Sequence, residues 1–224
     1  MIGIDHESTR WLVPIRGSIK AHQEHVFSLL AQRLGISCQS SVYLHIPATN
    51  RPAMEDTVNE ECSQLAICLI DEHPKQKCGE DCPLGEFKNS IETEDQLDQF
   101  VNSGLPHVGD FVNGDILSYL CGGAEKNDRL WTIAHEYVLI DNERMFECEA
   151  NLEECWWMKF PTGEKLACEI SRRLTLISDN ELRAMTKLPD TYHLNTSKDY
   201  GECLIRTKQL AGTFYSNCRF RYDH

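Results

Sequence analysis

The stretch EYVLIDNERMF, residues 136–146, places a single aspartate at the end of an apolar run. Four apolar residues, 137–140, lead directly to Asp141, and the chain turns polar after it. A short apolar run bounded by polar residues is typical of a buried strand. The carboxylate at its end has two interpretations: an ordinary turn residue at the surface, or a metal ligand held at the tip of a rigid strand.

The residues around this strand predict a hairpin set among helices. A second apolar run at 129–133 lies just before it, so we expect residues 129–133 and 136–141 to pair. Apolar residues at helical spacing predict helices on both sides of the hairpin. These helices are expected over residues 92–104, 107–123, 162–174, 178–190 and 197–220.

The first third of the chain has a different pattern. It predicts a strand at 10–17, a helix at 18–35 that Gly35 ends, and a strand at 40–47 that stops at Pro47. Residues 54–70 read as a helix that runs into a strand, and residues 71–90 read as a loop. We therefore predict an α+β protein, with a small mixed part over 1–90 and a mostly helical part over 91–224.

The charge is concentrated in one segment. The chain of 224 residues has a net charge of −13, and the segment 51–110 holds fourteen acidic against four basic residues, which is about −10. Such a segment repels phosphate backbones, so we expect no direct binding of nucleic acid. It attracts a basic protein partner, and the plainer interpretation is a solvated acidic face. No window of eighteen apolar residues occurs, so we expect no membrane span.

The chain is rich in cysteine, with eleven residues. The start of the chain lacks the basic and apolar pattern of a secretion signal, so we expect reduced thiols in a cytoplasmic protein. One group could bind zinc, namely Cys62, Cys68, Cys78 and Cys82. Only Cys78 and Cys82 have the close spacing that zinc sites use, so zinc is the weaker interpretation.

Three stretches, in this order and spacing, resemble the HipA-like atypical kinases, relatives of the phosphoinositide-kinase-like group. They cover residues 11–47, 115–146 and 176–192. The resemblance implies a compact two-lobed kinase-like fold and Mg-ATP as the cofactor. It also implies a serine/threonine protein kinase activity, and a setting in bacterial toxin–antitoxin, stress or phage defence systems.

The resemblance also assigns roles to residues. Asp141 matches the aspartate that binds magnesium, and Asn142 beside it is a candidate second ligand. Glu24 matches the glutamate that orients the nucleotide-binding lysine, with an exposed helix glutamate as the alternative. For the catalytic carboxylate two alignments remain open: Glu125 by its distance from Asp141, and Asp128 by the pair that it forms with the following arginine.

The sequence departs from the family pattern at several points. Pro14 lies where the lysine is expected, so Arg16 and Lys20 are the candidate substitutes. No asparagine follows the catalytic carboxylate in place, and only the first ten residues, with one glycine, are available for the phosphate-binding loop that should come before the first strand. We therefore interpret the chain as a degenerate kinase that binds or regulates a partner, with an active kinase as the alternative.

The adjacent pair Trp156 and Trp157 also has two interpretations. The rings either stack on a base or a peptide, or divide between core and interface.

Overall fold

The computed structural model describes residues 2–4, 10–12, 18–43, 65–68, 74–77, 91–102, 108–123, 128–132, 137–140, 142, 144–147, 149–190, 194 and 196–222. Helices dominate this part of the chain. They are α1 (Ser18–Arg33), α3 (Glu94–Val101), α4 (Val108–Leu120), α5 (Pro161–Thr175), α6 (Asp179–Met185) and α7 (Tyr200–Tyr222). Two short 3₁₀ turns, η2 (Leu152–Glu154) and η3 (Trp156–Lys159), precede α5. Each of these α-helices lies where the sequence predicts a helix.

The strands form two small antiparallel sheets. One has the order β1 (Ile2–Ile4), β2 (Arg10–Leu12), β4 (Leu65–Cys68) and β3 (Ser41–Tyr43), and the other joins β5 (Pro74–Lys77), β6 (Asp128–Thr132) and β7 (Tyr137–Ile140). The expected hairpin of β6 and β7 is confirmed. The sequence did not indicate β1, and it indicated a loop where β5 lies. β5 pairs with β6 across a long stretch of chain, a contact that local pattern does not reveal.

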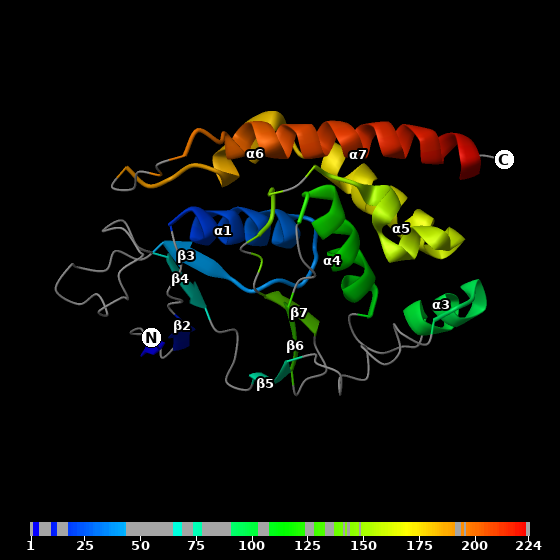
Figure 1. Cartoon of the computed structure of the whole chain (residues 1–224), viewed down its shortest axis with the longest axis horizontal. Coiled ribbons are helices and arrows are strands. Elements are labelled where there is room, and N and C mark those ends of the chain that lie inside the picture. The colour runs from blue at the N-terminus through cyan, green and yellow to red at the C-terminus, as the bar shows by residue number, and fades with distance from the viewer. Residues whose placement is uncertain are drawn as a thin grey trace.

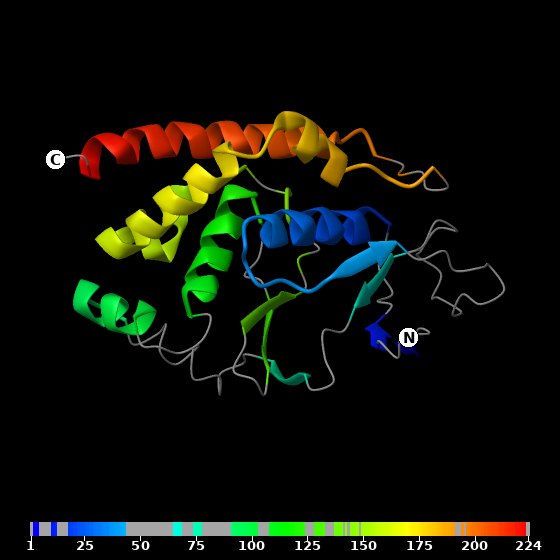
Figure 2. The same ribbon diagram turned by 180° about the vertical axis from the view of Figure 1, so that it is seen from behind.

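The elements are arranged around α1 and the long helix α7. In the two opposite views, α7 runs along one side of the molecule, and α1 lies between α7 and the strands β3 and β4 (Figure 1, Figure 2). α5 crosses beneath α7, and α4 stands between α5 and the hairpin. α4 packs against the hairpin strand β7, and the segment just before β3 pairs with β7 through a bridge of Cys38 to Leu139.

The ends of the helices follow from local sequence. Thr93 and Gln96 form a capping box at the start of α3, and the Ser178 side chain accepts from the Glu181 amide at the start of α6. Gly35 ends α1 with a φ of 73°, a conformation in which a residue with a Cβ is strained. The side chain of Glu181 also pairs with Arg33 at 2.5 Å, so that α6 holds the end of α1.

The core resolves the two interpretations of the tryptophan pair. Trp157 is fully buried, and its indole Nε1 donates to Asp115 Oδ2 at 2.9 Å. Trp156 is 38% exposed and carries the ammonium of Lys159 at 3.5 Å from its ring centroid. Trp157 is thus a core residue that ties η3 to α4, while Trp156 lies at the surface.

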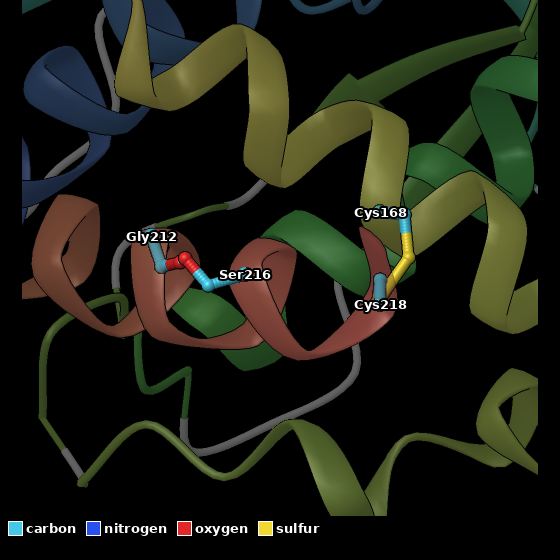
Figure 3. The surroundings of a disulfide bond; sticks show 4 residues. All are labelled: Cys168, Gly212, Ser216 and Cys218. Atoms are coloured by element: carbon cyan, nitrogen blue, oxygen red, sulfur yellow. A yellow bond between two sulfur atoms is a disulfide. The ribbon is translucent and has the colours of Figure 1, made fainter. Parts of the chain in front are cut away.

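A disulfide between Cys168 and Cys218 joins α5 to α7 (Figure 3). The expectation of reduced thiols is therefore wrong for these two residues. The two helices pack side by side and bring the Cα atoms to 6.1 Å, within the range that a disulfide spans, although 50 positions separate them in the sequence. Among the described helices, none is long and apolar enough to cross a membrane.

Candidate functional site

The residues that sequence reasoning singled out divide into three groups in the structure. Glu24, Lys20 and Asn142 are described with their side chains. Asp128 is described as the first residue of β6. The third group lies outside the described residues, so the roles of its members stay predictions. It consists of Arg16, Glu125 and Asp141, together with Cys62, Cys78 and Cys82 of the expected zinc group.

Glu24 lies in the middle of α1 and is fully buried. The alternative of an exposed helix glutamate is therefore wrong. The side-chain amide of Gln39 donates to Glu24 Oε1, and Gln39 is itself buried. A buried carboxylate needs such donors, because even a neutral polar group costs roughly 2–7 kcal/mol to bury without a partner, and an ionised carboxylate costs more. Lys20, one turn earlier on α1, is exposed.

Cys38 lies between Glu24 and the end of β7. Its Sγ donates to Ser28 Oγ at 3.5 Å and accepts from Asn142 Nδ2 at 3.7 Å. Burial raises the pKa of the Cys38 thiol to about 12, and the nearby Glu24 charge adds to this effect. Cys38 is therefore a neutral thiol near neutral pH, and it connects α1 to Asn142.

Backbone hydrogen bonds hold this connection in place. The amide of Gln39 donates to the carbonyl of Leu139 at 3.0 Å, and the amide of Leu139 donates to the carbonyl of Ser37 at 3.1 Å. Cys38 and Leu139 thus form a parallel bridge. The segment after α1 therefore lies beside β7, and this brings Glu24 and Asn142 into one cluster.

The side-chain amide of Asn142 has a hydrogen-bond partner for its nitrogen but none for its oxygen among the described residues. The side chain is fully buried, and its Oδ1 has no hydrogen-bond partner among the described residues. A carbonyl oxygen of this kind is a hard ligand that suits Mg²⁺. Within the described part of the chain, no group of three His, Cys, Asp or Glu side chains is placed to hold a metal. Asn142 therefore fits a magnesium site as one ligand, and Asp141 is the predicted second.

The hairpin register places Asp128 at the end of the sheet where β7 finishes. Asp128 pairs directly with Ile140, the residue before Asp141. This pairing lies beside the position that the resemblance assigns to magnesium. The choice between Glu125 and Asp128 as the catalytic carboxylate stays a prediction.

The start of the expected catalytic loop also lies close to the residues after β7. The amide of Phe146 donates to the Cys121 carbonyl at 2.8 Å. A Cβ on Gly123 would lie 2.9 Å from Met145 Cε, so the glycine allows this approach. The end of α4 and the segment that follows Asn142 thus lie next to each other.

Sequence reasoning missed a second polar cluster on α1. His22 Nδ1 lies 2.5 Å from the hydroxyl of Tyr43, and His25 Nδ1 lies 2.7 Å from Ser41 Oγ. The pKa of both histidines is lowered to about 4, mainly by burial and, for His22, also by repulsion from His25. Both rings are neutral near neutral pH. The histidines share one helical stretch with Glu24, which is the signal that could have indicated them.

The comparisons with known proteins agree with this arrangement at the level of the fold. The structure is similar to the crystal structure of the Helicobacter pylori proinflammatory kinase CtkA, with a TM-score of 0.55 and 12% sequence identity. The match covers 96% of this chain and 92% of that one. No family model and no curated protein sequence matches the chain. The fold is therefore kinase-like and rich in helix.

Proposed function

We propose that this protein is a HipA-like kinase-fold protein with a degenerate nucleotide site, which acts by binding and regulating a protein partner. The observation that supports this proposal is the proline at position 14, where the resemblance expects the nucleotide-binding lysine. The carboxylate that would orient a nucleotide-binding lysine is fully buried and accepts from a neutral amide. Catalysis of phosphoryl transfer needs cations and metal ions that are placed to stabilise the charge of the transferred group.

The partner in this proposal is a basic protein surface. The segment 51–110 carries about −10 of the net charge, and complementary charge speeds association and fixes orientation. We place the protein in a two-lobed kinase arrangement and in a bacterial toxin–antitoxin, stress or defence system, as the resemblance implies. Its compartment in this proposal is the cytoplasm.

A second candidate is an active Mg-ATP-dependent serine/threonine protein kinase. It is favoured by the partnerless Oδ1 of Asn142 among the described residues and by the pairing of Asp128 with Ile140. In this candidate Asp141 and Asn142 hold magnesium, which neutralises phosphate charge when bound. The similarity to a kinase across nearly all of both chains shows that a chain of this length can have such a fold.

The remaining roles in this second candidate follow from the resemblance. Asp128 or Glu125 positions the acceptor hydroxyl, and Glu24 orients a cation from Arg16 or Lys20.

Thermal melting with and without Mg-ATP separates the two candidates. A ligand that binds only the native state raises the melting temperature when it is present well above its dissociation constant. The degenerate site predicts no shift at millimolar Mg-ATP, compared with magnesium alone and with ATP plus EDTA. A shift that Asp141→Ala abolishes, together with transfer of labelled phosphate to a protein, would overturn the first proposal in favour of the second.

A pull-down with a basic surface tests the partner role independently. Poly-L-lysine beads should retain the protein at low salt, because the acidic segment attracts them. Retention that is equal for a variant with the acidic residues of 51–70 neutralised would contradict the segment's role.

A further inference from the structure

A pocket of about 470 Å³ lies away from the Glu24 cluster, between the C-terminal end of α4, residues 146–147 and 149–150, and the first half of α7. This volume falls in the range of pockets that hold small molecules. Neither the kinase resemblance nor the proposed function uses it. α4 and α7, which frame it, also pack against each other, so its two sides are fixed relative to one another.

Three apolar residues of the pocket lining, called the floor below, include one whose backbone has a constrained conformation. Leu120, Phe146 and Leu210 contribute the apolar surface. Phe146 is buried and has a φ of 65°, which a residue with a large side chain rarely adopts. Its amide donates to Cys121, and the ammonium of Lys198 donates to its carbonyl. Strained backbone persists only where its surroundings fix it, and it is concentrated at ligand sites.

Two charged residues that line the pocket, one acidic and one basic, have neither a hydrogen-bond nor an ion-pair partner in the described part of the protein. Glu147 lies on the rim but is bound by Arg144 at 3.0 Å. Lys198 is engaged with the Phe146 carbonyl. Glu149 and Arg206 have no ion-pair or hydrogen-bond partner in the described part of the chain. A ligand that pairs with both would carry an anionic and a cationic group.

We propose that this pocket binds a small zwitterion with an apolar body, in the class of leucine-like amino acids and short apolar peptides with free ends. The carboxylate pairs with Arg206 on α7, and the ammonium pairs with Glu149. The apolar side chains lie on Leu120, Phe146 and Leu210. Charge-assisted hydrogen bonds at both ends then fix the orientation, while the apolar floor supplies most of the buried area.

The pocket is connected to the candidate kinase site through a short stretch of chain. Gln23, next to Glu24 on α1, donates from its side-chain amide to the Met145 carbonyl at 2.8 Å. The amide of Met145 donates to the Asn142 carbonyl at 3.4 Å, and the next residue, Phe146, lies on the pocket floor. The inference goes beyond the proposed function, and the pocket's ligand can be tested without any nucleotide.

Cys203 supplies a direct reporter of occupancy. It lines the pocket and is half-buried, whereas Cys121 beside it is buried. Burial raises the pKa of the Cys203 thiol, so labelling is done at mildly alkaline pH. Iodoacetamide labelling of the full chain is followed by peptide mass mapping, with leucyl-leucine as the probe. At ten times its dissociation constant, leucyl-leucine should slow labelling of Cys203 about elevenfold, because only the unoccupied fraction reacts.

Capped peptides and charge variants test the two rim contacts. N-acetyl-leucyl-leucine keeps only the carboxylate, and leucyl-leucine amide keeps only the ammonium, so each should bind at least about tenfold more weakly. Arg206→Gln and Glu149→Gln should each weaken leucyl-leucine by at least about tenfold. Lys165→Gln and Glu153→Gln, exposed residues outside the pocket, are the matched controls and should leave protection unchanged.

Three results would overturn the proposal. They are absence of protection by both leucine and leucyl-leucine, equal protection by the capped peptides, and equal loss of protection in the control variants. Melting curves of each variant without ligand show that it is folded before labelling. Because no nucleotide is present, failure here leaves the Mg-ATP experiment unaffected.

Discussion

At the scale of single residues, the hydrogen bond from Gln39 to Glu24 is the contact that most directly separates the candidate site from an ordinary core. Both side chains are buried. Gln39→Leu removes one donor from a buried carboxylate, so the free energy of unfolding should fall by about 1–3 kcal/mol. Urea denaturation measures this change. Gln209→Leu, at an exposed position of α7, is the control and should alter it by less than about 0.5 kcal/mol. Equal effects of the two substitutions would show that the bond is not formed.

The two buried histidines of α1 predict a dependence of stability on pH. In the unfolded chain His22 and His25 protonate below their ordinary pKa of 6.5, whereas in the folded protein burial lowers the pKa of both to about 4. Between these values the unfolded state binds more protons, so the free energy of unfolding should decrease as pH falls from 6.5 towards 4. The difference between the two pKa values corresponds to about 3 kcal/mol for each histidine at most.

Urea denaturation at several pH values from about 7 to 4.5 covers this window of lowered pKa. Carboxylates contribute to the dependence as well, so the comparison is with the double variant His22→Gln and His25→Gln. That variant should be less stable near neutral pH, because it loses the bonds to Tyr43 and Ser41, but its stability should fall less as the pH drops below 6.5. An unchanged slope in that window would contradict the lowered pKa values.

At the scale of elements, two glycines in helices predict opposite effects of the same substitution. A Cβ on Gly163, in the first turn of α5, would overlap the Trp157 carbonyl of η3. Gly163→Ala should therefore lower the free energy of unfolding by more than about 3 kcal/mol. A Cβ on Gly212, inside α7, would meet Thr175 at 3.5 Å, which is ordinary contact. Gly212→Ala should raise the free energy of unfolding by about 0.4–1 kcal/mol, because alanine has less conformational freedom than glycine in the unfolded chain. Urea denaturation compares the two, and the reverse order would contradict the packing of η3 on α5.

The disulfide between α5 and α7 predicts a large effect of reduction. The helices are in extensive contact, and in the last turns of α7 the Ser216 hydroxyl donates to the Gly212 carbonyl at 2.8 Å near the bond (Figure 3). Closing a loop of 50 positions in the unfolded chain corresponds to about 4 kcal/mol of stability. Reductant should lower the melting temperature of the wild type. It should have a much smaller effect on the double variant Cys168→Ser and Cys218→Ser, and equal effects would contradict the bond.

At the scale of the whole molecule, local sequence patterns predict the helices and the hairpin, but they do not predict contacts between residues that lie far apart in the chain. The helices and the hairpin follow from periodicity, glycines and capping residues such as Thr93 and Ser178. Three contacts join residues far apart in the chain, and no local pattern encodes them: the pairing of β5 with β6, the bridge of Cys38 to Leu139 and the Cys168–Cys218 bond. The same limit applies to the site: the sequence marks Glu24 and Asn142, but only the fold shows that two adjacent residues bind them, Gln39 donating to Glu24 and the Cys38 thiol accepting from Asn142.

The uneven charge of the chain predicts how the whole molecule associates with a basic surface. The segment 51–110 supplies about −10 of the net −13, and the rest of the chain about −3. Neutralising six acidic residues in this segment should therefore remove most of the attraction to poly-L-lysine at low salt, and slow association several-fold or more. The six substitutions to Gln or Asn are at Glu55, Asp56, Glu60, Glu61, Glu80 and Asp81.

A variant with the same change in total charge is the matched control, because it separates the local charge from the net charge. Its six substitutions to Gln or Asn are at exposed acidic residues of the helical part, namely Glu149, Glu153, Glu154, Asp179, Asp190 and Asp199. Stopped-flow association at increasing ionic strength measures both variants. The segment variant should lose most of the salt dependence and the control should keep it, because the concentrated charge of the segment dominates the attraction that salt screens. If both variants lose it equally, net charge alone attracts the basic surface, and the acidic segment has no special role.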